Sequence, residues 1–224
     1  MKTVIFDLDG TLADTSGDLI AAANRCFEEM GLGAVLDPVA DASTAFGGAR
    51  AMLNLGLTRV GHADVAGEVE HWYPKLVAYY GEKIDVHTTL YPGAMEAVQA
   101  LRDGGYKVGI CTNKPAGLAE TLLTRLGVRS AFASLVGADT LPVRKPDPAP
   151  LREAARLAGG DPAQTVLIGD TVTDRETARA LAVPCILVTF GPDGRGVERL
   201  EPEGLIGHFD ALLAEVERLI GAPH

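Results

Sequence analysis

The chain has 224 residues, 47% hydrophobic and 22% charged, which allows one sizeable core with a small inserted domain and is ordinary for a globular protein. A formal net charge of −10 argues against nucleic acid as a partner, and no apolar run is long enough to cross a bilayer. Cys26, Cys111 and Cys185 are too widely spaced for a disulfide framework or a zinc knuckle. Because the first residues also lack a secretion signal, we expect a cytoplasmic protein with neither a membrane nor a nucleic acid as partner.

The first predicted element is a short strand at residues 4–6, an unbroken apolar run of the kind that is buried on both faces of a parallel sheet. Asp7 and Asp9 follow it directly, and strand alternation would place both on one side of the chain. Ligands bind beyond the carboxyl ends of such strands. Two carboxylates so close need a cation, a shared proton or strong hydrogen bonds, and their hard oxygens suit Mg²⁺. The alternative is a polar strand end with only a structural role.

Helical spacing dominates the next seventy residues. Apolar residues recur at helical intervals from Leu19 to Met30, and further helical stretches follow at 50–57 and 64–80, with breaks at Gly47-Gly48 and Gly61. The sequence therefore predicts an all-helical cap domain over 16–83, inserted into a core made of 1–15 and 84–224.

Helices and strands alternate in the remainder of the chain. Strands are expected at 107–111, 135–137, 166–168 and 186–188, and helices at 93–102, 115–127, 148–157, 174–181 and 209–220. Such alternation predicts an α/β fold: a Rossmann-like parallel sheet with helices on both faces and right-handed crossovers.

Polar residues that suit phosphoryl transfer follow several of these strands. Asp7 offers a carboxylate nucleophile, and Asp170 could share a Mg²⁺ with it, while Asp174 lies one helical turn further on, where it could bind the metal or orient its waters. Thr112 stands at a helix start, where phosphoryl oxygens are readily held, and Lys145 is a cation in a proline-stiffened loop. A nucleophile, a metal and charge-neutralising donors are what phosphoryl transfer needs.

These clusters resemble the four motifs of the haloacid dehalogenase (HAD) superfamily over essentially the whole chain. The matching segments are Asp7-Leu8-Asp9-Gly10-Thr11-Leu12, the strand end at Thr112, Lys145-Pro146, and Gly169-Asp170-Thr171-Val172-Thr173-Asp174. More narrowly, the segments 90–93, 111–115, 144–148 and 189–191 resemble phosphoglycolate phosphatases. One departure is Ala182-Val183-Pro184, which stands where the family leads us to expect a glycine after the helix.

The resemblance implies a role for each motif residue. Asp7 would attack phosphorus and become an aspartyl phosphate, while Asp9 would protonate the leaving alcohol and then activate water. Thr112 and Lys145 would hold phosphoryl oxygens. Mg²⁺ would bind to Asp7, the backbone carbonyl of Asp9 and Asp170, with Asp174 in support. The dehalogenase branch lacks the second motif aspartate, so Asp9 favours phosphate over halide.

Further residues are candidates for binding substrate. They are Gly10, Thr11, Asn113 and Lys114 in the core, and Gly48 and Arg50 in the insertion, where similar cap domains present a substrate-reading loop. Glycine permits close backbone approach, and arginine can fork onto a carboxylate or phosphate. A loop glycine followed by a solvated arginine is an equally acceptable interpretation of Gly48 and Arg50. Lys114 could likewise be a surface residue near a helix start.

The sequence thus predicts a Mg²⁺-dependent phosphomonoesterase that acts on a small phosphorylated metabolite, with 2-phosphoglycolate as the leading candidate. Three alternatives remain open: a phosphatase for a sugar phosphate or nucleotide, a phosphoglucomutase-like phosphotransferase, and a metabolite-binding protein without turnover. Both a monomer and a homodimer are compatible with the sequence.

Overall fold

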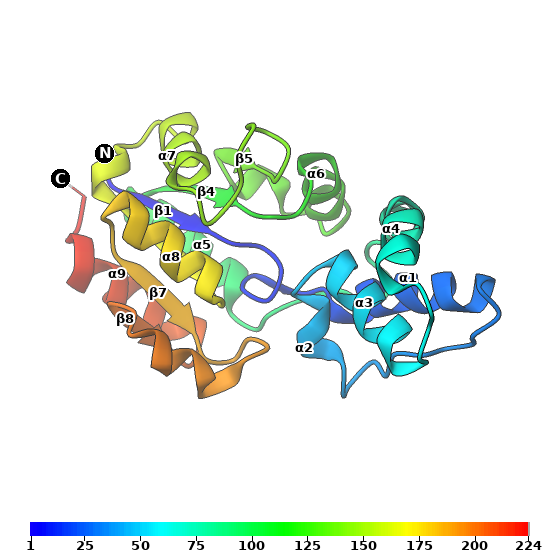
Figure 1. Cartoon of the computed structure of the whole chain (residues 1–224). Helices are drawn as coiled ribbons and strands as arrows, with labels where there is room; N and C mark the ends of the chain where they lie inside the picture. The colour runs from blue at the N-terminus through cyan, green and yellow to red at the C-terminus, as the bar shows by residue number, and fades with distance from the viewer. Residues whose placement is uncertain (224) are drawn as a thin grey trace. The chain divides into compact units, whose positions relative to one another are not determined.

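The computed structural model describes residues 1–223 and divides the chain into two compact units. One unit contains residues 1–13 and the chain from residue 90 onward, and the other contains residues 14–89 (Figure 1). The sequence placed the corresponding boundaries at 16 and 83, a few residues inside those of the structure. No helix within residues 1–223 is both long enough and apolar enough to cross a membrane.

A parallel sheet forms the centre of the first unit. Its strand order is β5-β4-β1-β6-β7-β8, with β1 at Thr3–Phe6, β4 at Lys107–Cys111, β5 at Ser134–Val136, β6 at Thr165–Gly169, β7 at Cys185–Val188 and β8 at Gly204–Ile206. Each neighbouring pair is parallel, and Phe6 lies opposite Ile110 on one side and Ile168 on the other. Every residue of β1 is buried, as its unbroken apolar run predicts.

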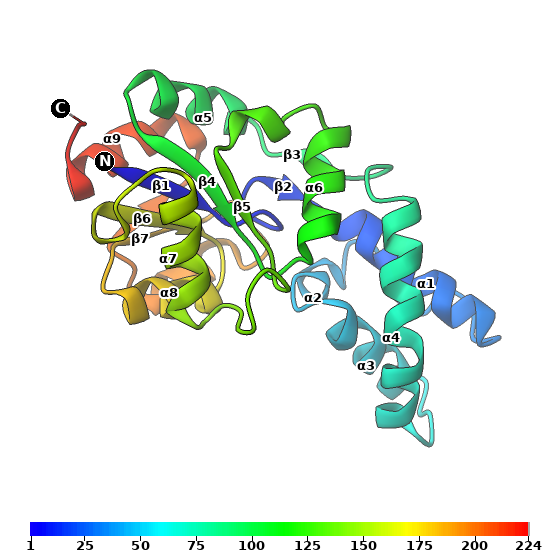
Figure 2. The same ribbon diagram turned by 90° about the horizontal axis from the view of Figure 1, so that it is seen from above.

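Helices cover both faces of this sheet. Figure 2 shows α5 (Ala94–Asp103) and α9 (Leu212–Ile220) on one face and α7 (Pro148–Leu157) and α8 (Val172–Leu181) on the other. The remaining helix, α6 (Ala116–Arg125), contacts β5. Ile5, Leu151 and Leu167 belong to the fully buried core that joins the sheet to α7 and α8. The predicted α/β fold is confirmed.

Some local features differ from the sequence prediction. Strand β8 and the 3-10 segment Gly194–Leu200 were not predicted, and Pro115 directly precedes α6 instead of forming its first residue. Three shorter 3-10 segments occur at Arg129–Ala131, Pro162–Gln164 and Phe209–Ala211. Ala182 ends α8 with a φ of 59°, the left-handed conformation that glycine usually adopts at this place. The expected glycine is therefore replaced by a residue that takes up the same backbone conformation.

The second unit is built from helices. These are α1 (Ser16–Glu29), α2 (Ala42–Ala45), α3 (Ala49–Arg59) and α4 (Val65–Glu82), and the two-residue strands β2 (Ala13–Asp14) and β3 (Thr89–Leu90) lie where the chain enters and leaves the unit. Helix α4 contacts both α1 and α3 and buries Trp72 and Leu76. The buried carboxylate of Asp18 on α1 accepts hydrogen bonds from the backbone of His87 and from both the backbone and the hydroxyl of Thr88. Asp18 thereby fixes the last residues of the unit to its first helix.

Candidate active site

The candidate residues of the core meet at the carboxyl ends of its three central strands. Asp7 follows β1, Thr112 follows β4 and Asp170 follows β6, and β1 lies between the other two in the sheet. From β1 the chain builds β4 and β5 on one side of the sheet, and then β6, β7 and β8 on the other. Open α/β sheets bind their ligands at the edge where the chain changes direction in this way.

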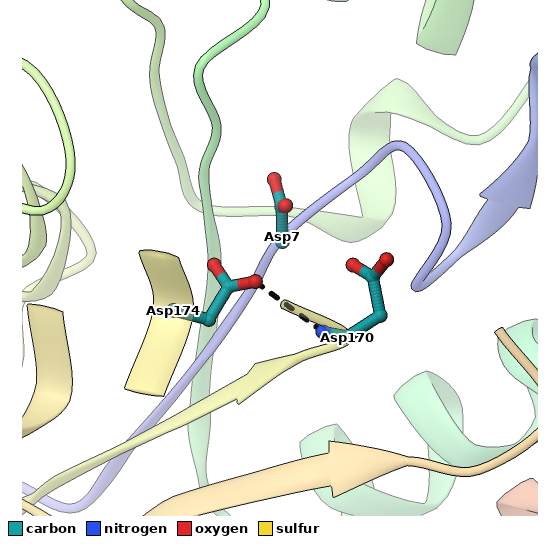
Figure 3. Close-up of side chains that lie close together, drawn as sticks. All are labelled: Asp7, Asp170 and Asp174. Atoms are coloured by element: carbon teal, nitrogen blue, oxygen red, sulfur yellow. Dashed lines mark hydrogen bonds between the residues drawn. The ribbon is translucent and has the colours of Figure 1, made fainter. Parts of the chain in front are cut away.

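Three carboxylates form a buried cluster at this edge of the sheet. Asp7, Asp170 and Asp174 each place one oxygen within 4.8 Å of the others, and Figure 3 shows the three side chains together. Asp174 is the third residue of α8, and its Oδ2 accepts hydrogen bonds from the backbone N–H of Thr171 (3.1 Å), from the Thr171 hydroxyl (2.7 Å) and from the Asp170 N–H (3.3 Å). This capping box fixes the Asp174 side chain relative to Asp170.

Lys145 supplies positive charge to the same cluster. Its Nζ lies 2.7 Å from Asp174 Oδ1 and 3.1 Å from Asp7 Oδ1, and only 1% of the side chain is exposed. Burial alone would lower the pKa of the Lys145 ammonium, but the Asp174 and Asp7 carboxylates outweigh it and raise that pKa. Lys145 therefore remains a cation at physiological pH. Its carbonyl accepts a hydrogen bond from Asn113 Nδ2 (3.0 Å), and the peptide bond to Pro146 is cis.

The remaining charge of the cluster is negative and strongly desolvated. Burial raises the pKa of Asp7 to about 6, and it raises the pKa of Asp170 as well. The neighbouring Asp174 adds to both shifts, whereas Lys145 opposes them. Both shifts therefore express mainly the burial of these carboxylates, to which their mutual repulsion adds.

Asp170 carries the observation that tests whether a metal would fit. Its Oδ1 accepts a hydrogen bond from the Thr11 hydroxyl (2.8 Å), while its Oδ2 is buried with no hydrogen-bond partner among the described residues. A buried carboxylate oxygen without a partner is costly unless a cation binds it. The cluster is moreover made of hard oxygen donors. The residues present therefore fit a divalent cation.

Gly10 shapes the loop that faces Asp170. Its φ is +83°, and a Cβ at this position would overlap the Asp170 carboxylate. Gly191, in the loop after β7, is equally constrained, because its Cβ would lie 2.8 Å from the Gly10 carbonyl oxygen and 3.1 Å from Asp170 Cβ. Sequence reasoning gave Gly191 no role, and its close approach is visible only in three dimensions. That Gly10 and Thr11 bind substrate stays a prediction.

The turn after β4 brings a second lysine to the site. Thr112 is buried, and its Oγ1 accepts a hydrogen bond from the N–H of Lys114 (3.1 Å). The Lys114 ammonium lies 2.7 Å from Asp9 Oδ1, in an ion pair that the sequence did not suggest. Together with Asp7, Asp170, Asp174 and Lys145, this pair gives four carboxylates and two ammonium groups. When all are ionised, a divalent cation would balance their charge.

Gly48 and Arg50 belong to the helical unit. Gly48 precedes α3 with a φ of +88°, and no described atom lies within 4 Å of the position that its Cβ would take. Arg50 donates from Nε and Nη2 to the two carboxylate oxygens of Glu70 (2.8 and 2.9 Å), and its guanidinium lies 3.7 Å from the centre of the Tyr73 ring. Arg50 therefore links α3 to α4 in this structure, and its binding of substrate stays a prediction.

The α/β fold carries a buried acidic centre at the carboxyl ends of its central strands, and comparison with known proteins identifies its family. Residues 4–188 match the model of the haloacid dehalogenase-like hydrolases. The chain belongs to this family, and the predicted family is confirmed.

Relatives along almost the whole chain are phosphatases. The chain is 38% identical over 220 residues to a phosphoglycolate phosphatase of Mesorhizobium japonicum, a match that covers 98% of this chain and 96% of the relative. It is 37% identical over 214 residues to a phosphoglycolate phosphatase of Rhodospirillum rubrum, with 93% and 87% covered. The protein is thus a phosphatase of the HAD superfamily.

Solved structures share the fold. A predicted phosphoglycolate phosphatase from Haemophilus somnus superimposes with a TM-score of 0.84 at 24% identity, covering 96% of this chain and 97% of the other. A predicted phosphatase from Clostridium acetobutylicum gives a TM-score of 0.75 at 20% identity, covering 97% and 99%. At these identities the likeness concerns the fold alone.

Proposed function

We propose that the protein is a Mg²⁺-dependent phosphatase that hydrolyses 2-phosphoglycolate to glycolate and phosphate through an aspartyl phosphate on Asp7. The observation that carries the proposal is the position of Asp7, at the end of the central strand, beside Lys145 and within the carboxylate cluster. Relatives that share 34–38% of its residues and bear the name phosphoglycolate phosphatase support the choice of substrate.

Each step of the reaction has a residue to perform it. An oxygen of the Asp7 carboxylate attacks phosphorus, the bond from phosphorus to the alcohol oxygen breaks, and Asp9 gives its proton to that oxygen. Asp9 then takes a proton from a water molecule, whose oxygen attacks the phosphoryl group and releases phosphate from Asp7. Splitting the transfer into two displacements replaces one difficult step by two easier ones.

The transferred group needs positive surroundings. Lys145 and the turn at Thr112 would hold the phosphoryl oxygens, since Lys145 is a buried cation 3.1 Å from the nucleophile. Asp7, Asp170 and the backbone carbonyl of Asp9 would hold Mg²⁺, with Asp174 in support. When bound, Mg²⁺ supplies positive charge next to the developing negative charge of the phosphoryl group.

We assign the helical unit, residues 14–89, the role of a cap that selects the leaving group. A centre that handles only the phosphoryl group cannot distinguish one alcohol from another, so the selection needs further residues. Gly48 and Arg50 are its candidates, because an arginine can bind the carboxylate of phosphoglycolate through two parallel hydrogen bonds.

The proposal is tested by measuring phosphate release from a panel of phosphorylated metabolites with Mg²⁺ and with EDTA. We expect the highest kcat/KM for 2-phosphoglycolate and no turnover in EDTA. Higher kcat/KM for a sugar phosphate or a nucleotide would contradict the substrate. Full activity in EDTA would contradict the metal.

Two variants test the covalent step. Asp7→Asn should lower kcat at least about a thousand-fold, a rise in barrier of about 4 kcal/mol, whereas Asp210→Asn, an exposed carboxylate of the same unit, should leave kcat unchanged. Asp9→Asn should accumulate a phosphorylated chain when the leaving group is good, because the second displacement then lacks its base. Detection of that species by intact mass identifies the phosphoenzyme. Parental turnover in Asp7→Asn would refute the mechanism.

A further inference from the structure

The backbone of Lys114 is fixed before its side chain reaches the site. Its N–H donates to Thr112 Oγ1 (3.1 Å), and its carbonyl accepts a hydrogen bond from the N–H of Ala138 (3.0 Å), in the loop after β5. Gly137 permits this contact, since a Cβ there would lie 2.8 Å from the Lys114 carbonyl oxygen. The Lys114 side chain therefore starts from a rigid point between two strands of the sheet.

The side chain of Lys114 is directed at Asp9. It is only 4% exposed, and its Nζ lies 2.7 Å from Asp9 Oδ1, a length typical of a charge-assisted hydrogen bond. A long side chain that is already immobilised by burial loses little further entropy when it forms such a bond. The orientation of the Asp9 carboxylate is therefore set in part by the turn after β4.

Asn113 and Lys114, in the turn after β4, both donate hydrogen bonds to neighbouring loops. Asn113 donates to the carbonyl of Lys145, and Lys114 donates to the carboxylate of Asp9. The turn thus connects the loop that carries Lys145 with the loop that carries Asp9. All these residues lie in the α/β unit.

We propose that Lys114 is a positioning residue for Asp9, which it holds oriented toward the leaving oxygen, and that it does not act by binding the substrate itself. The proposal rests on the role of Asp9 in the proposed function, but it does not depend on phosphoglycolate as the substrate. Proton transfer needs the acid within hydrogen-bond reach of the oxygen that it protonates. An Asp9 carboxylate that turned freely would meet this condition less often.

The test compares aryl phosphates whose leaving groups differ in acidity, using the full-length protein with Mg²⁺. For Lys114→Met, which keeps the apolar stem and removes the ammonium, we expect kcat/KM for phenyl phosphate to fall about ten- to a hundred-fold. For p-nitrophenyl phosphate, whose leaving group needs less protonation, we expect a fall below about threefold. Lys107→Met removes an ammonium from the first residue of β4, the strand that precedes the turn of Lys114, and should change neither value.

Combining the substitution with Asp9→Asn separates positioning from direct binding. If Lys114 acts through Asp9, adding Lys114→Met to Asp9→Asn should lower kcat/KM less than about twofold further. Equal losses on the two aryl phosphates, or a fully additive loss in the double variant, would overturn the proposal. Lys114→Gln, which keeps a neutral donor, provides the same comparison if the methionine variant is unstable, and it should retain more activity on phenyl phosphate than Lys114→Met.

A failure of the proposed function would look different. If the parent turns over aryl phosphates but not phosphoglycolate, the substrate is wrong and the comparison of leaving groups still decides the role of Lys114. If Asp9→Asn itself shows no dependence on the leaving group, the assigned acid is wrong, and the proposal for Lys114 is overturned with it.

Discussion

Replacing Asp170 by asparagine should stabilise the metal-free protein while it removes the response to metal. Asp170 is 1% exposed, and burial, followed by the Asp174 and Asp7 charges, raises its pKa. The Thr11 hydroxyl can still donate to the remaining oxygen of an asparagine, as it does to Asp170 Oδ1. The new amide would face carboxylates in place of a repelling charge. In EDTA the variant should therefore be more stable than the parent.

The expected magnitudes come from two opposing effects. Relief of a poorly compensated buried charge contributes about 1–3 kcal/mol to the free energy of unfolding of the metal-free variant. In the parent, Mg²⁺ at a hundred times its dissociation constant adds about 2.7 kcal/mol. For a chain of this length, 1 kcal/mol shifts Tm by about 2–4 °C, so Mg²⁺ should raise the parental Tm by about 5–10 °C. Asp170→Asn should lose most of this shift.

The assay is thermal unfolding followed by circular dichroism, in EDTA and in excess Mg²⁺. Asp210→Asn, which changes an exposed carboxylate, should keep the parental shift with Mg²⁺. The reasoning is refuted if Asp170→Asn unfolds at a lower temperature than the parent in EDTA, or if Mg²⁺ still raises its Tm by the parental amount. The first result would mean that the carboxylate is satisfied without metal. The second would remove Asp170 from the metal site.

Three further predictions concern other residues of the two units. In EDTA the free energy of unfolding should fall as pH rises from about 4 to about 6, because the folded protein raises the pKa of Asp7 from 3.8 to about 6 and so binds its proton more tightly. Asp7→Asn should remove about 3 kcal/mol of this pH dependence in urea titrations, and an unchanged dependence would contradict the reasoning. Arg50→Ala should lower kcat/KM for phosphoglycolate by about tenfold or more, and Glu70→Gln by less than about threefold. Equal losses would contradict a role of Arg50 in binding substrate and would mean that it only links α3 to α4. Gly191→Ala should weaken Mg²⁺ binding measured by calorimetry, since the new Cβ would lie 2.8 Å from the Gly10 carbonyl oxygen. Gly117→Ala, where no atom lies within 4 Å of the new Cβ, should leave it unchanged, and equal Mg²⁺ affinity in both variants would contradict the prediction.

Most of the fold was predictable because its signals are local. The run at residues 4–6 is apolar without interruption because β1 is buried on both faces of the sheet, so the burial can be inferred from the sequence itself. Strand β8 gave no comparable signal. It has three residues, begins with glycine and exposes Leu205, and it is a strand only because its backbone pairs with β7 at the edge of the sheet.

The sequence predicted which residues form the site better than it predicted the contacts between them. Asp7 and Asp170 follow apolar runs, and a parallel sheet brings the ends of its strands together whatever the loops between them do. The pair of Lys114 with Asp9 joins residues 105 positions apart, and no spacing in the sequence indicates it. Arg50 shows the converse, because its sequence context suggests an available cation, and the structure places Glu70 against it.

The two lysines of the site divide its carboxylates between them, and the division follows the chemistry proposed for each. Lys145 contacts Asp7 and Asp174, and neither carboxylate exchanges a proton with the substrate or with water in the proposed reaction, so a partner that stays cationic suits both. Asp9 must instead gain and lose a proton in the proposed reaction. Its partner is Lys114, from a different loop, and the Asp9 side chain is 20% exposed. The Lys114 side chain is only 4% exposed, so its ammonium keeps a fixed place beside the Asp9 carboxylate, which is partly open to water. Lys114 can therefore hold Asp9 in place while the Asp9 carboxylate stays accessible to the leaving oxygen and to water, which a general acid and base requires.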